Sequence, residues 1–505
     1  MNSNSQFRGS NFQYQMSQAA LAAVGSGAAL AILMFIGGFA AGSASVVYAS
    51  MALLAFLIPA ATGLLRGRQF DIFEPVNLVA GAILFATTIR AFYLMASDSS
   101  RAEFLMMGAS FDAVNAQIPW MLLGIAALSI GYIVVPYRVP LERLSFVQRF
   151  TVSRGRLWTA IGFATVTGLV GVGLFMTRFG ISLSDGILAL SRKRAAEFVG
   201  DSGEIIYGKG YEVFLGQFSQ YGFILLAAVL CAGLLRWNGR NIGAVSALFF
   251  LSIIVPFMSS SRSSILLLLI IACILAYYYG RIHLKAILIA AVIAATVVTG
   301  MGALREFNQQ GAIEREGAVD AIIGSGNGID FVRTAAIMER VPSVRPFQNG
   351  TTYAALFTSV IPRGIWPEKP NPSMGVWIKG ELFGQSVRKN GWPPGMIAEA
   401  YINFGIPGIP IVMFIFGGLL RVFYESCRPH LGVSLPITIL YAVSIWRLAF
   451  GTIGLNFAHG ILQVLQYVIP MLALLWLARS PRRRRGHNPA LGHMPMDRIP
   501  KSSGV

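Results

Sequence analysis

The chain has 505 residues, of which 55% are hydrophobic, with a mean hydropathy of +0.63 and a formal net charge of +18 at pH 7. Apolar runs of about 20 residues recur along nearly its whole length, which is what a helix needs to cross the ~30 Å hydrocarbon core of a bilayer. This pattern excludes a soluble globular protein. In a membrane protein, the excess of cations is typical of loops that face anionic lipid, so we expect no nucleic-acid binding.

We predict an all-α polytopic membrane protein with about twelve transmembrane helices. In chain order the predicted spans are residues 19–40, 46–65, 76–95, 119–136, 157–176, 213–235, 242–258, 264–279, 286–304, 396–420, 433–449 and 455–478. The polar stretch before the first span lacks a strongly basic region, so we interpret that span as a retained helix, although GSASVV after it leaves a cleavage site open. The three cysteines lie in or beside predicted spans, so no disulfide framework is indicated.

The arginines of the short loops fix the predicted orientation. They follow the even-numbered spans, as with Arg66 and Arg421, and the sequence RSPRRRR follows the last span. By the positive-inside rule, these loops and both termini are cytoplasmic. We therefore predict a cytoplasmic tail (residues 1–18), nine spans (19–304), a large external loop between spans nine and ten (305–395), three further spans (396–478) and a basic cytoplasmic tail (479–505).

The external loop contains the proline-rich segment SVIPRGIWPEKPNP, residues 359–372. Its four prolines fix φ and remove backbone donors, which favours an extended shape. Because the segment also contains Arg363 and Lys369, we predict that it forms a rigid cationic wall over the outer membrane surface. Trp366 would lie at the membrane interface or stack on a bound ligand. Arg305 and Arg345 add further cations to this loop, and a solvated, charge-balanced loop is the alternative interpretation.

Two other arginines are predicted near the outer membrane surface. Arg262, in MSSSRSSILLLL, lies in a short external turn, where the phosphates of a lipid-linked substrate would be found; a snorkelling anchor is the alternative. Arg447, in SIWRLAFG, falls near the outer end of its span. An intramembrane cation needs a partner and marks a candidate functional site.

An acid and a histidine are candidates for proton transfer. In WPPGMIAEAYINFGIPG, Glu399 lies just inside an apolar span, shares a helix face with Asn403 four residues later, and is close to Tyr401. A carboxylate partly withdrawn from water suits a general base, whereas a structural ion pair with an external arginine is the alternative. His459, in LNFAHGIL, lies about one turn inside the last span and is either a second candidate base or a packing residue.

Several chemistries lack their usual residues. The sequence contains no Walker A motif, no GxGxxG after a strand, no HExxH, no CxxC pair and no Asp-x-Asp. The nearest paired acids, Glu314 and Glu316, flank Arg315, which weakens them as metal ligands. We therefore expect no cofactor and no metal, with arginines supplying the positive charge that Mg²⁺ provides elsewhere.

The order of three motifs resembles the Wzy-type O-antigen and exopolysaccharide repeat-unit polymerases. The motifs are SSRSS before an apolar span, then NGTTYAALFTSVIPRGIWPEKP, then PPGMIAEAYINFGIPG at the start of another span, and the resemblance is best between Ser259 and Gly418. Arg447 is similar to a further arginine near the end of such polymerases, where this chain continues with Leu448.

The resemblance implies an inner-membrane glycosyltransferase that acts at the periplasmic face. It would transfer a growing glycan from polyprenyl pyrophosphate onto a lipid-linked repeat unit. The implied partners are a polyprenyl-pyrophosphate-linked donor and acceptor and the lipid bilayer, with a chain-length regulator and a flippase as further candidates. Arginine forks suit a pyrophosphate leaving group.

We expect two groups of site residues. The catalytic candidates are Arg262, Arg363, Glu399 and His459, and the substrate-binding candidates are Arg305, Arg345, Trp366, Lys369, Tyr401, Asn403 and Arg447. Two other functions stay open: an O-antigen ligase that delivers glycan to a lipid A core, and a lipid-linked oligosaccharide flippase or other transporter. Polar residues gathered at one membrane face argue against the transporter, which usually lines a central cavity.

Overall fold

The structure is a computed structural model that describes residues 4–66, 70–98, 106, 109–144, 150–178, 211–258, 262–282, 331–359, 361, 365–366, 374–384, 392–454 and 456–480. Within these residues the chain is helical, without a β-strand. Its principal helices are α1 (Asn4–Ala40), α2 (Ala44–Leu65), α3 (Pro75–Ile83), α4 (Ile89–Met95), α6 (Phe111–Val134), α8 (Arg154–Arg178), α10 (Tyr211–Gly216), α11 (Phe218–Cys231), α12 (Gly239–Met258), α13 (Arg262–Tyr278), α19 (Gly395–Cys427), α20 (Leu435–Gly454) and α21 (Phe457–Ala478). The shorter elements are π-helical turns at Leu84–Thr88 and Ile378–Leu382, 3₁₀ turns at Leu141–Arg143 and Arg428–His430, and helices α16 (Phe331–Arg340), α17 (Thr351–Thr358) and α18 (Gly375–Trp377).

The helices coincide with eleven of the twelve predicted spans. In the part of the chain that is described, eight helices are long and apolar enough to cross a membrane, and three shorter apolar helices lie at Gly239–Ile254, Ser264–Tyr278 and Leu435–Gly451. The span predicted at 286–304 lies outside the described residues, as does most of the predicted external loop. The all-helical, multi-pass class is therefore confirmed, while the count of twelve and the placement of that loop stay predictions. Helix α1 begins at Asn4, well before the predicted start of the first span.

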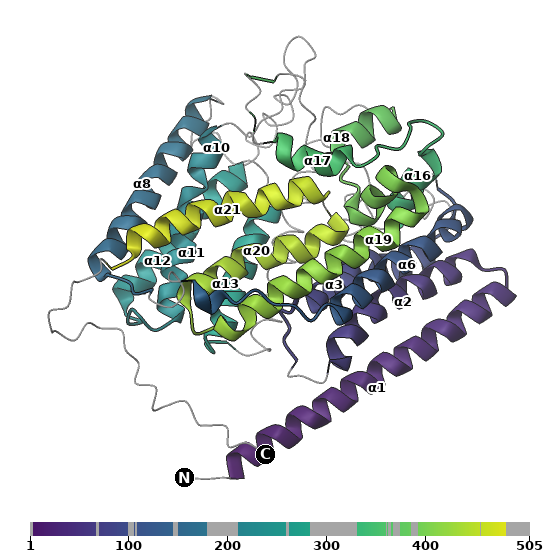
Figure 1. Ribbon diagram of the computed structural model, residues 1–505, viewed down its shortest axis with the longest axis horizontal. Helices are drawn as coiled ribbons and strands as arrows, with labels where there is room; N and C mark the ends of the chain where they lie inside the picture. Colours follow the sequence, from purple (N-terminus) through teal and green to yellow (C-terminus); the bar gives the residue numbers. More distant parts are fainter. Residues whose placement is uncertain are drawn as a thin grey trace.

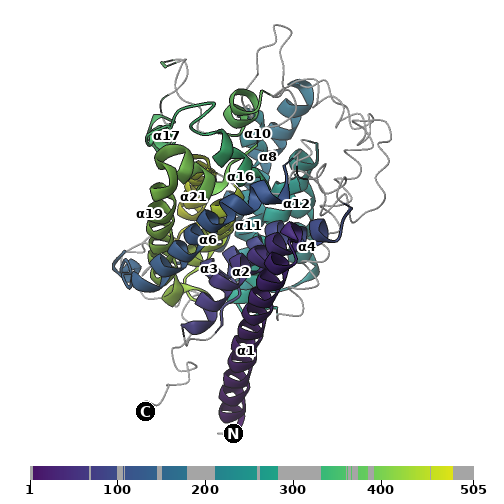
Figure 2. The same cartoon turned by 90° about the vertical axis from the view of Figure 1, so that its right-hand side faces the viewer.

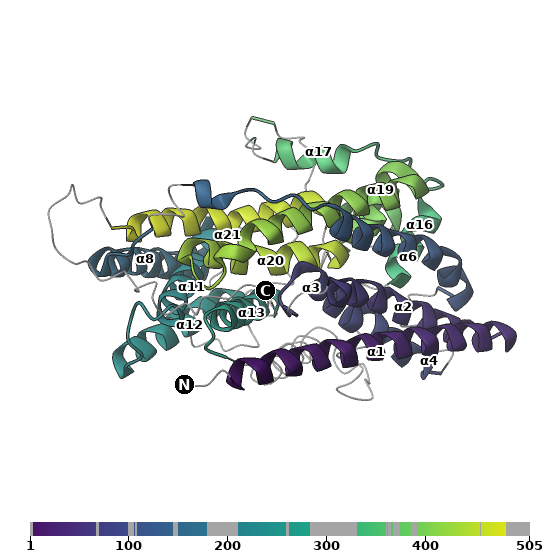
Figure 3. The same cartoon turned by 60° about the horizontal axis from the view of Figure 1, so that its bottom comes forward.

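Helices α19, α20 and α21 run side by side through the molecule, and α6 packs along α19 (Figures 1 and 3). The α6–α19 contact is the most extensive between helices of the described part, because glycines face backbone at the crossing. A Cβ added to Gly131 would overlap the carbonyl oxygen of Phe414, and one added to Gly417 would overlap that of Leu128. Small residues at a crossing let two helices approach closely in a membrane, where burial of apolar surface drives association only weakly.

Helix α1 lies at the edge of the bundle and packs along α2 (Figures 1 and 2). Its large apolar side chains, including Leu33, Ile36 and Phe39, are exposed. Exposed apolar residues on a membrane-spanning helix are what contact with lipid requires, so this exposure agrees with a helix at the lipid boundary.

Helix α19 is interrupted at Gly405, whose φ of 67° and ψ of −159° are not helical. Two prolines, Pro407 and Pro410, follow the interruption and remove backbone donors from the next turn. The first ten residues of α19 can therefore point differently from the rest of the helix. The short helices α16 and α17 pack against this first segment, at the upper end of the molecule in Figure 1.

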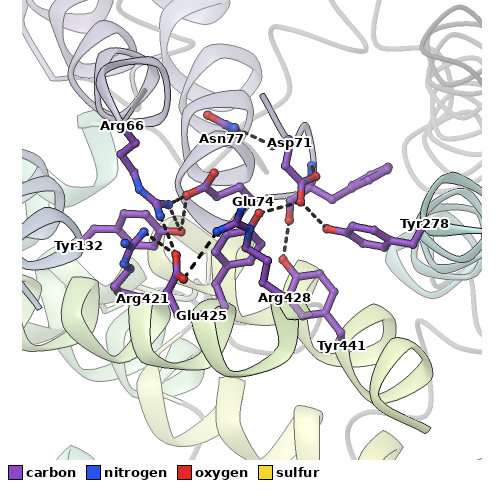
Figure 4. A network of polar contacts seen from close by, with 12 residues as sticks. Arg66, Asp71, Glu74, Asn77, Tyr132, Tyr278, Arg421, Glu425, Arg428 and Tyr441 are labelled. Carbon is purple, nitrogen blue, oxygen red and sulfur yellow. Dashed lines mark hydrogen bonds and ion pairs between the residues drawn. The ribbon is translucent and has the colours of Figure 1, made fainter. Parts of the chain in front are cut away.

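A buried network of charges and tyrosines joins helices at the other end of α19 (Figure 4). Arg66 forms ion pairs with Glu74 and, at 2.6 Å, with Glu425, which also pairs with Arg421 at 3.0 Å. The Tyr132 hydroxyl donates to Glu74 at 2.8 Å. These contacts tie the α2–α3 turn and the C-terminal end of α6 to the C-terminal end of α19.

A second part of this network surrounds Asp71, between α2 and α3. The hydroxyls of Tyr278 and Tyr424 both donate to its Oδ2 atom at 2.8 Å, and the backbone N–H of Phe73 donates to Oδ1 at 3.0 Å. Burial raises the pKa of the Asp71 carboxyl, while the hydrogen bonds from the two tyrosines oppose that shift. The network includes Arg66, which the sequence predicts to lie in a cytoplasmic loop.

Candidate functional site

Glu399 is fully buried in the first segment of α19, and both of its carboxylate oxygens accept hydrogen bonds. The Thr352 hydroxyl of α17 donates to Oε1 at 2.8 Å, and the backbone N–H of Phe457 donates to Oε2 at 2.6 Å. The side chain of Asn456 also hydrogen-bonds to this carboxylate. Phe457 is the first residue of α21, so the carboxylate caps that helix at its positive end. Glu399 forms no ion pair with any described residue.

Asn403 supports the same arrangement from the next turn of α19. Its Nδ2 atom donates to Thr352 Oγ1 at 2.7 Å and to the carbonyl oxygen of Glu399 at 2.8 Å, while its Oδ1 atom accepts from the N–H of Gly350 at 2.9 Å. The expected shared face of Glu399 and Asn403 is thus present. Asn403 fixes the chain just before α17, where Asn349 and Gly350 have φ of 47° and 88°, a conformation that asparagine and glycine tolerate best.

Tyr353 adds an aromatic side chain beside this cluster. Its ring stacks on Phe404 with 6.0 Å between centroids and tilts against Phe457 at 5.7 Å. Burial raises the pKa of Tyr353, and the nearby Glu399 carboxylate raises it further, so the hydroxyl stays neutral at physiological pH. That hydroxyl is buried and has no hydrogen-bond partner among the described residues. It is therefore a group that could bind a substrate hydroxyl.

Tyr401 points away from the carboxylate and toward α16. Its hydroxyl donates to the carbonyl oxygens of Val341 at 2.9 Å and Met338 at 3.2 Å. These carbonyls lie at the C-terminal end of α16, where helix carbonyls lack partners within their own helix. Tyr401 thus attaches the α16 segment to α19, and its predicted role in substrate binding remains a prediction.

His459 and Arg447 are joined by a residue that the sequence did not single out, Gln463. The Nη1 atom of Arg447, on α20, donates to Gln463 Oε1, and Gln463 Nε2 lies 2.7 Å from His459 Nε2. The Arg447 guanidinium also lies over the Tyr467 ring, 4.7 Å from its centroid. His459, Gln463 and Tyr467 are spaced four residues apart and form one row along α21.

The remaining predicted site residues lie elsewhere. Arg345 forms an ion pair with Glu381 at 3.4 Å in which both side chains are about half exposed, and Trp366 is 40% exposed. Arg262 is the first residue of α13, and its side chain lies outside the described part. Arg305, Arg363 and Lys369 lie outside the described residues altogether.

The structure therefore brings four predicted residues to one region: Glu399 and Asn403 at the start of α19, His459 in the first turn of α21, and Arg447 on α20. Arg421 lies 22 positions after Glu399 on the same helix, or roughly 30 Å along it. The region and the Figure 4 network are thus at opposite ends of a helix long enough to cross the membrane.

Metal ligands are not gathered in the described ranges, where no group of three or more His, Cys, Asp or Glu side chains could hold an ion. Glu314 and Glu316 lie outside those ranges, so metal independence stays a prediction.

Four residues of this region were not predicted from the sequence: Thr352, Tyr353, Asn456 and Gln463. Thr352 and Tyr353 stand within the quoted motif NGTTYAALF, but their contact with Glu399 connects residues 47 apart in the chain. Gln463 was within reach of sequence reasoning, because it follows His459 by one helical turn.

Comparison with known proteins identifies the family. Residues 220–469 match the family model described as "Putative O-antigen polymerase". A search of curated proteins and a search of solved structures each found no match. The matched region contains α13, α19 and α20 and most of α11 and α21, and with them Glu399, Arg447 and His459. The chain is a multi-pass membrane protein that belongs to the O-antigen polymerase family.

Proposed function

We propose that the protein is an inner-membrane glycosyltransferase that polymerises polyprenyl-pyrophosphate-linked repeat units into O-antigen or exopolysaccharide at the periplasmic face, without a metal ion. Membership of the family implies a polymerase that acts on lipid-linked oligosaccharides. Beyond family membership, the proposal specifies the membrane face at which the reaction occurs, the leaving group and the residues that take part.

The observation that carries the proposal is the gathering of Glu399, Asn403, His459 and Arg447 at one end of α19. This end is opposite the cluster of Arg66, Arg421 and Arg428, which the positive-inside rule assigns to the cytoplasm. A reaction on substrates held in the outer leaflet requires its polar groups at that opposite end. Glu399 caps α21 two residues before His459, and Gln463 links His459 to Arg447. Such polar groups are costly within a membrane protein and usually functional.

The chemistry of the transfer matches these side chains. The acceptor hydroxyl oxygen bonds to the anomeric carbon of the donor, and the bond from that carbon to the pyrophosphate oxygen breaks, leaving both electrons on the pyrophosphate. Arginines stabilise the charge that develops there, and Arg447 keeps its Nε–H without a hydrogen-bond partner among the described residues. The hydroxyl proton passes to a base, for which Glu399 is the candidate. Arg262 and Arg363 are the further candidates for the pyrophosphate.

The test is polymerisation by the purified full-length protein. Incubation with lipid-linked repeat units in EDTA should give a ladder of glycans on a gel, and wild-type activity should be unchanged by adding Mg²⁺. Activity that EDTA abolishes and Mg²⁺ restores would contradict the metal-free mechanism and direct attention to Glu314 and Glu316. Transfer of glycan only when a lipid A core is supplied would instead indicate a ligase, and movement of lipid-linked sugar across vesicles without any ladder would indicate a transporter.

A further inference from the structure

The hydroxyl of Tyr353 is buried without a hydrogen-bond partner among the described residues. This state lowers the stability of the folded protein, because the hydroxyl has given up its hydrogen bonds to water and gained none in return. Several other buried tyrosines of the bundle avoid that loss, since their hydroxyls donate to a carboxylate, a side-chain amide or a carbonyl oxygen: Tyr132, Tyr278, Tyr424, Tyr441 and Tyr467.

Packing accounts for the ring of Tyr353 but not for its hydroxyl. The ring lies parallel to that of Phe404 on α19, with 4° between the planes and 6.0 Å between the centroids, and it is tilted against Phe457 of α21 at 5.7 Å. A phenylalanine would make both ring contacts and would leave no unpaired hydroxyl. A residue that is less stable than a simple alternative at its position is typical of a functional site.

The surroundings of the hydroxyl indicate the kind of ligand it binds. Tyr353 follows Thr352, whose hydroxyl donates to Glu399, and its ring contacts Phe457, whose backbone N–H donates to the same carboxylate. The Tyr353 hydroxyl is neutral and can both donate and accept a hydrogen bond. A sugar carries hydroxyls on adjacent carbons, so a carboxylate and a phenol that lie close together are suited to bind two of them at once.

We propose that Tyr353 is a substrate-binding residue whose hydroxyl binds the acceptor sugar, at a hydroxyl group next to the one that Glu399 deprotonates. The identity of the sugar as the acceptor rests on the proposed function, whereas a sugar-binding hydroxyl at Tyr353 does not. The new hydrogen bond pairs the group that is unpaired in the ligand-free protein. It also gives the acceptor a second fixed point beside the carboxylate, which selects one of several similar hydroxyls for reaction.

The structure shows this site closed. Glu399 is fully buried and the Tyr353 oxygen is inaccessible to solvent, so a sugar reaches the two groups only when the elements that cover them shift. Helix α17 is part of that cover, because it packs on the start of α21 and on α19 at the upper end of the molecule in Figure 1. Its outer face is free of protein contacts at Phe357, which is 76% exposed. Binding of the acceptor therefore involves a movement of α17.

Tyr353→Phe separates a ligand-binding hydroxyl from a structural one, because it removes the oxygen and keeps the ring. The melting temperature of the ligand-free variant in detergent should equal or exceed that of the wild type, since no described group loses a hydrogen bond. Tyr441→Phe, in the network of Figure 4, is the matched control. The Tyr441 hydroxyl donates to the Phe73 carbonyl at 2.7 Å, so its removal should lower the melting temperature. A Tyr353→Phe protein that melts as low as the control would overturn the proposal.

Sugar binding is measured without turnover. The probe is the free oligosaccharide of the repeat unit, released by mild acid from the lipid-linked form; it has the acceptor hydroxyls but no leaving group. Titration of the full-length protein, followed by ligand-observed NMR, should show a Kd about 10- to 100-fold higher in Tyr353→Phe than in the wild type. The Kd of Tyr441→Phe should equal that of the wild type. Polyprenyl pyrophosphate without a sugar should bind equally to all three proteins.

The other outcomes decide against the proposal or against the proposed function separately. A wild type that does not bind the oligosaccharide, or a Tyr353→Phe protein that binds it as tightly as the wild type, overturns the sugar site. Weaker binding of polyprenyl pyrophosphate to Tyr353→Phe would assign the hydroxyl to the donor and would also overturn the proposal. If the purified wild type makes no polymer but binds the oligosaccharide through Tyr353, the proposed function fails and the sugar site stands.

Discussion

The carboxylate of Glu399 contacts two parts of the chain that are far apart in the sequence. One oxygen accepts from Thr352 of α17, and the other accepts from the first N–H of α21. Each carboxylate oxygen has a second lone pair, so a capping role and a role as base are compatible. If Glu399 is only a cap, removing its charge should mainly lower stability. If it is also the base, removing its charge should mainly lower turnover.

The first prediction concerns Glu399→Gln. Because the NH₂ half of the amide cannot accept, at least one of the three groups that hydrogen-bond to the carboxylate loses its partner, and the free energy of unfolding should fall by about 1–3 kcal/mol. If Glu399 is the base, the turnover of the protein that is still folded should fall by about 10²–10⁴-fold, a loss that the change in stability does not explain. Thermal unfolding in detergent and the in vitro ladder measure the two effects.

Thr352→Val is the control for that variant. It removes one donor to the carboxylate at nearly constant side-chain volume and keeps the charge, so stability should fall while most of the turnover remains. Near-normal chain synthesis by Glu399→Gln would assign proton transfer elsewhere, and equal activity losses in the two variants would make Glu399 a structural cap.

The second prediction concerns Arg363, the arginine of the proline-rich segment. If it grips pyrophosphate through two parallel hydrogen bonds, Arg363→Lys keeps the charge but loses the fork. The rate should then fall by about 30- to 1000-fold, or about 2–4 kcal/mol in transition-state stabilisation. The measurement is polymer length in a polymerase-deleted strain that expresses Arg363→Lys or Arg363→Ala at matched membrane abundance. Full rescue by lysine alone reduces the claim to a charge requirement, and full rescue by both variants removes Arg363 from the site.

At the scale of the element, α19 is two segments with different tasks. The segment after Gly405 packs against α6 through Gly417 and carries Arg421 and Glu425 into the Figure 4 network. The segment before Gly405 carries Glu399 and Asn403 and packs on α16 and α17. The interruption therefore lets the polar end take its own direction while the rest of the helix stays fixed in the bundle.

The third prediction concerns Gly405→Ala. The backbone conformation of Gly405 is one that only glycine adopts readily, so alanine should lower the free energy of unfolding by about 1–3 kcal/mol. Polymerisation should fall as well, because relief of the strain redirects Glu399 and Asn403. Gly81→Ala, in α3, is the matched control, since an added Cβ meets nothing within 4 Å there and helical alanine is favoured by about 0.5–1 kcal/mol. A Gly405→Ala protein as stable and active as the control would show that the interruption has no role.

At the scale of the whole molecule, the network of Figure 4 joins regions inside and outside the family match. Arg66, Glu74 and Tyr132 precede the matched residues 220–469, whereas Arg421 and Glu425 lie within them. The charges of this network are nearly withdrawn from solvent, with side-chain exposures of 9% for Arg66 and 13% for Glu425. The N-terminal helices are thus an integral part of the bundle that supports the site.

The fourth prediction concerns Glu425→Gln. Removal of this charge leaves Arg66 and Arg421 short of a buried partner, which should cost about 3–5 kcal/mol in stability. Thermal unfolding in detergent measures the loss. Glu142→Gln is the control, because Glu142 is a half-exposed acid that pairs with Arg138 at 3.6 Å and with His430 at 3.5 Å, and the loss of such surface pairs should leave the melting temperature nearly unchanged. Equal melting temperatures for both variants would show that the network does not hold the two regions together.

The sequence by itself determined the membrane class, eleven of the helix positions and the family, because the length of an apolar run is a local property that decides whether a helix can cross the bilayer. It also placed Glu399 and Asn403 on one helix face, since their spacing of four fixes that relation. Only the tertiary structure decided that Glu399 caps α21, that Thr352 reaches it from α17, and that Gln463 stands between Arg447 and His459. Those contacts join helices distant in the chain, and their geometry depends on the interruption at Gly405 and on close helix crossings, which no local pattern of residues encodes.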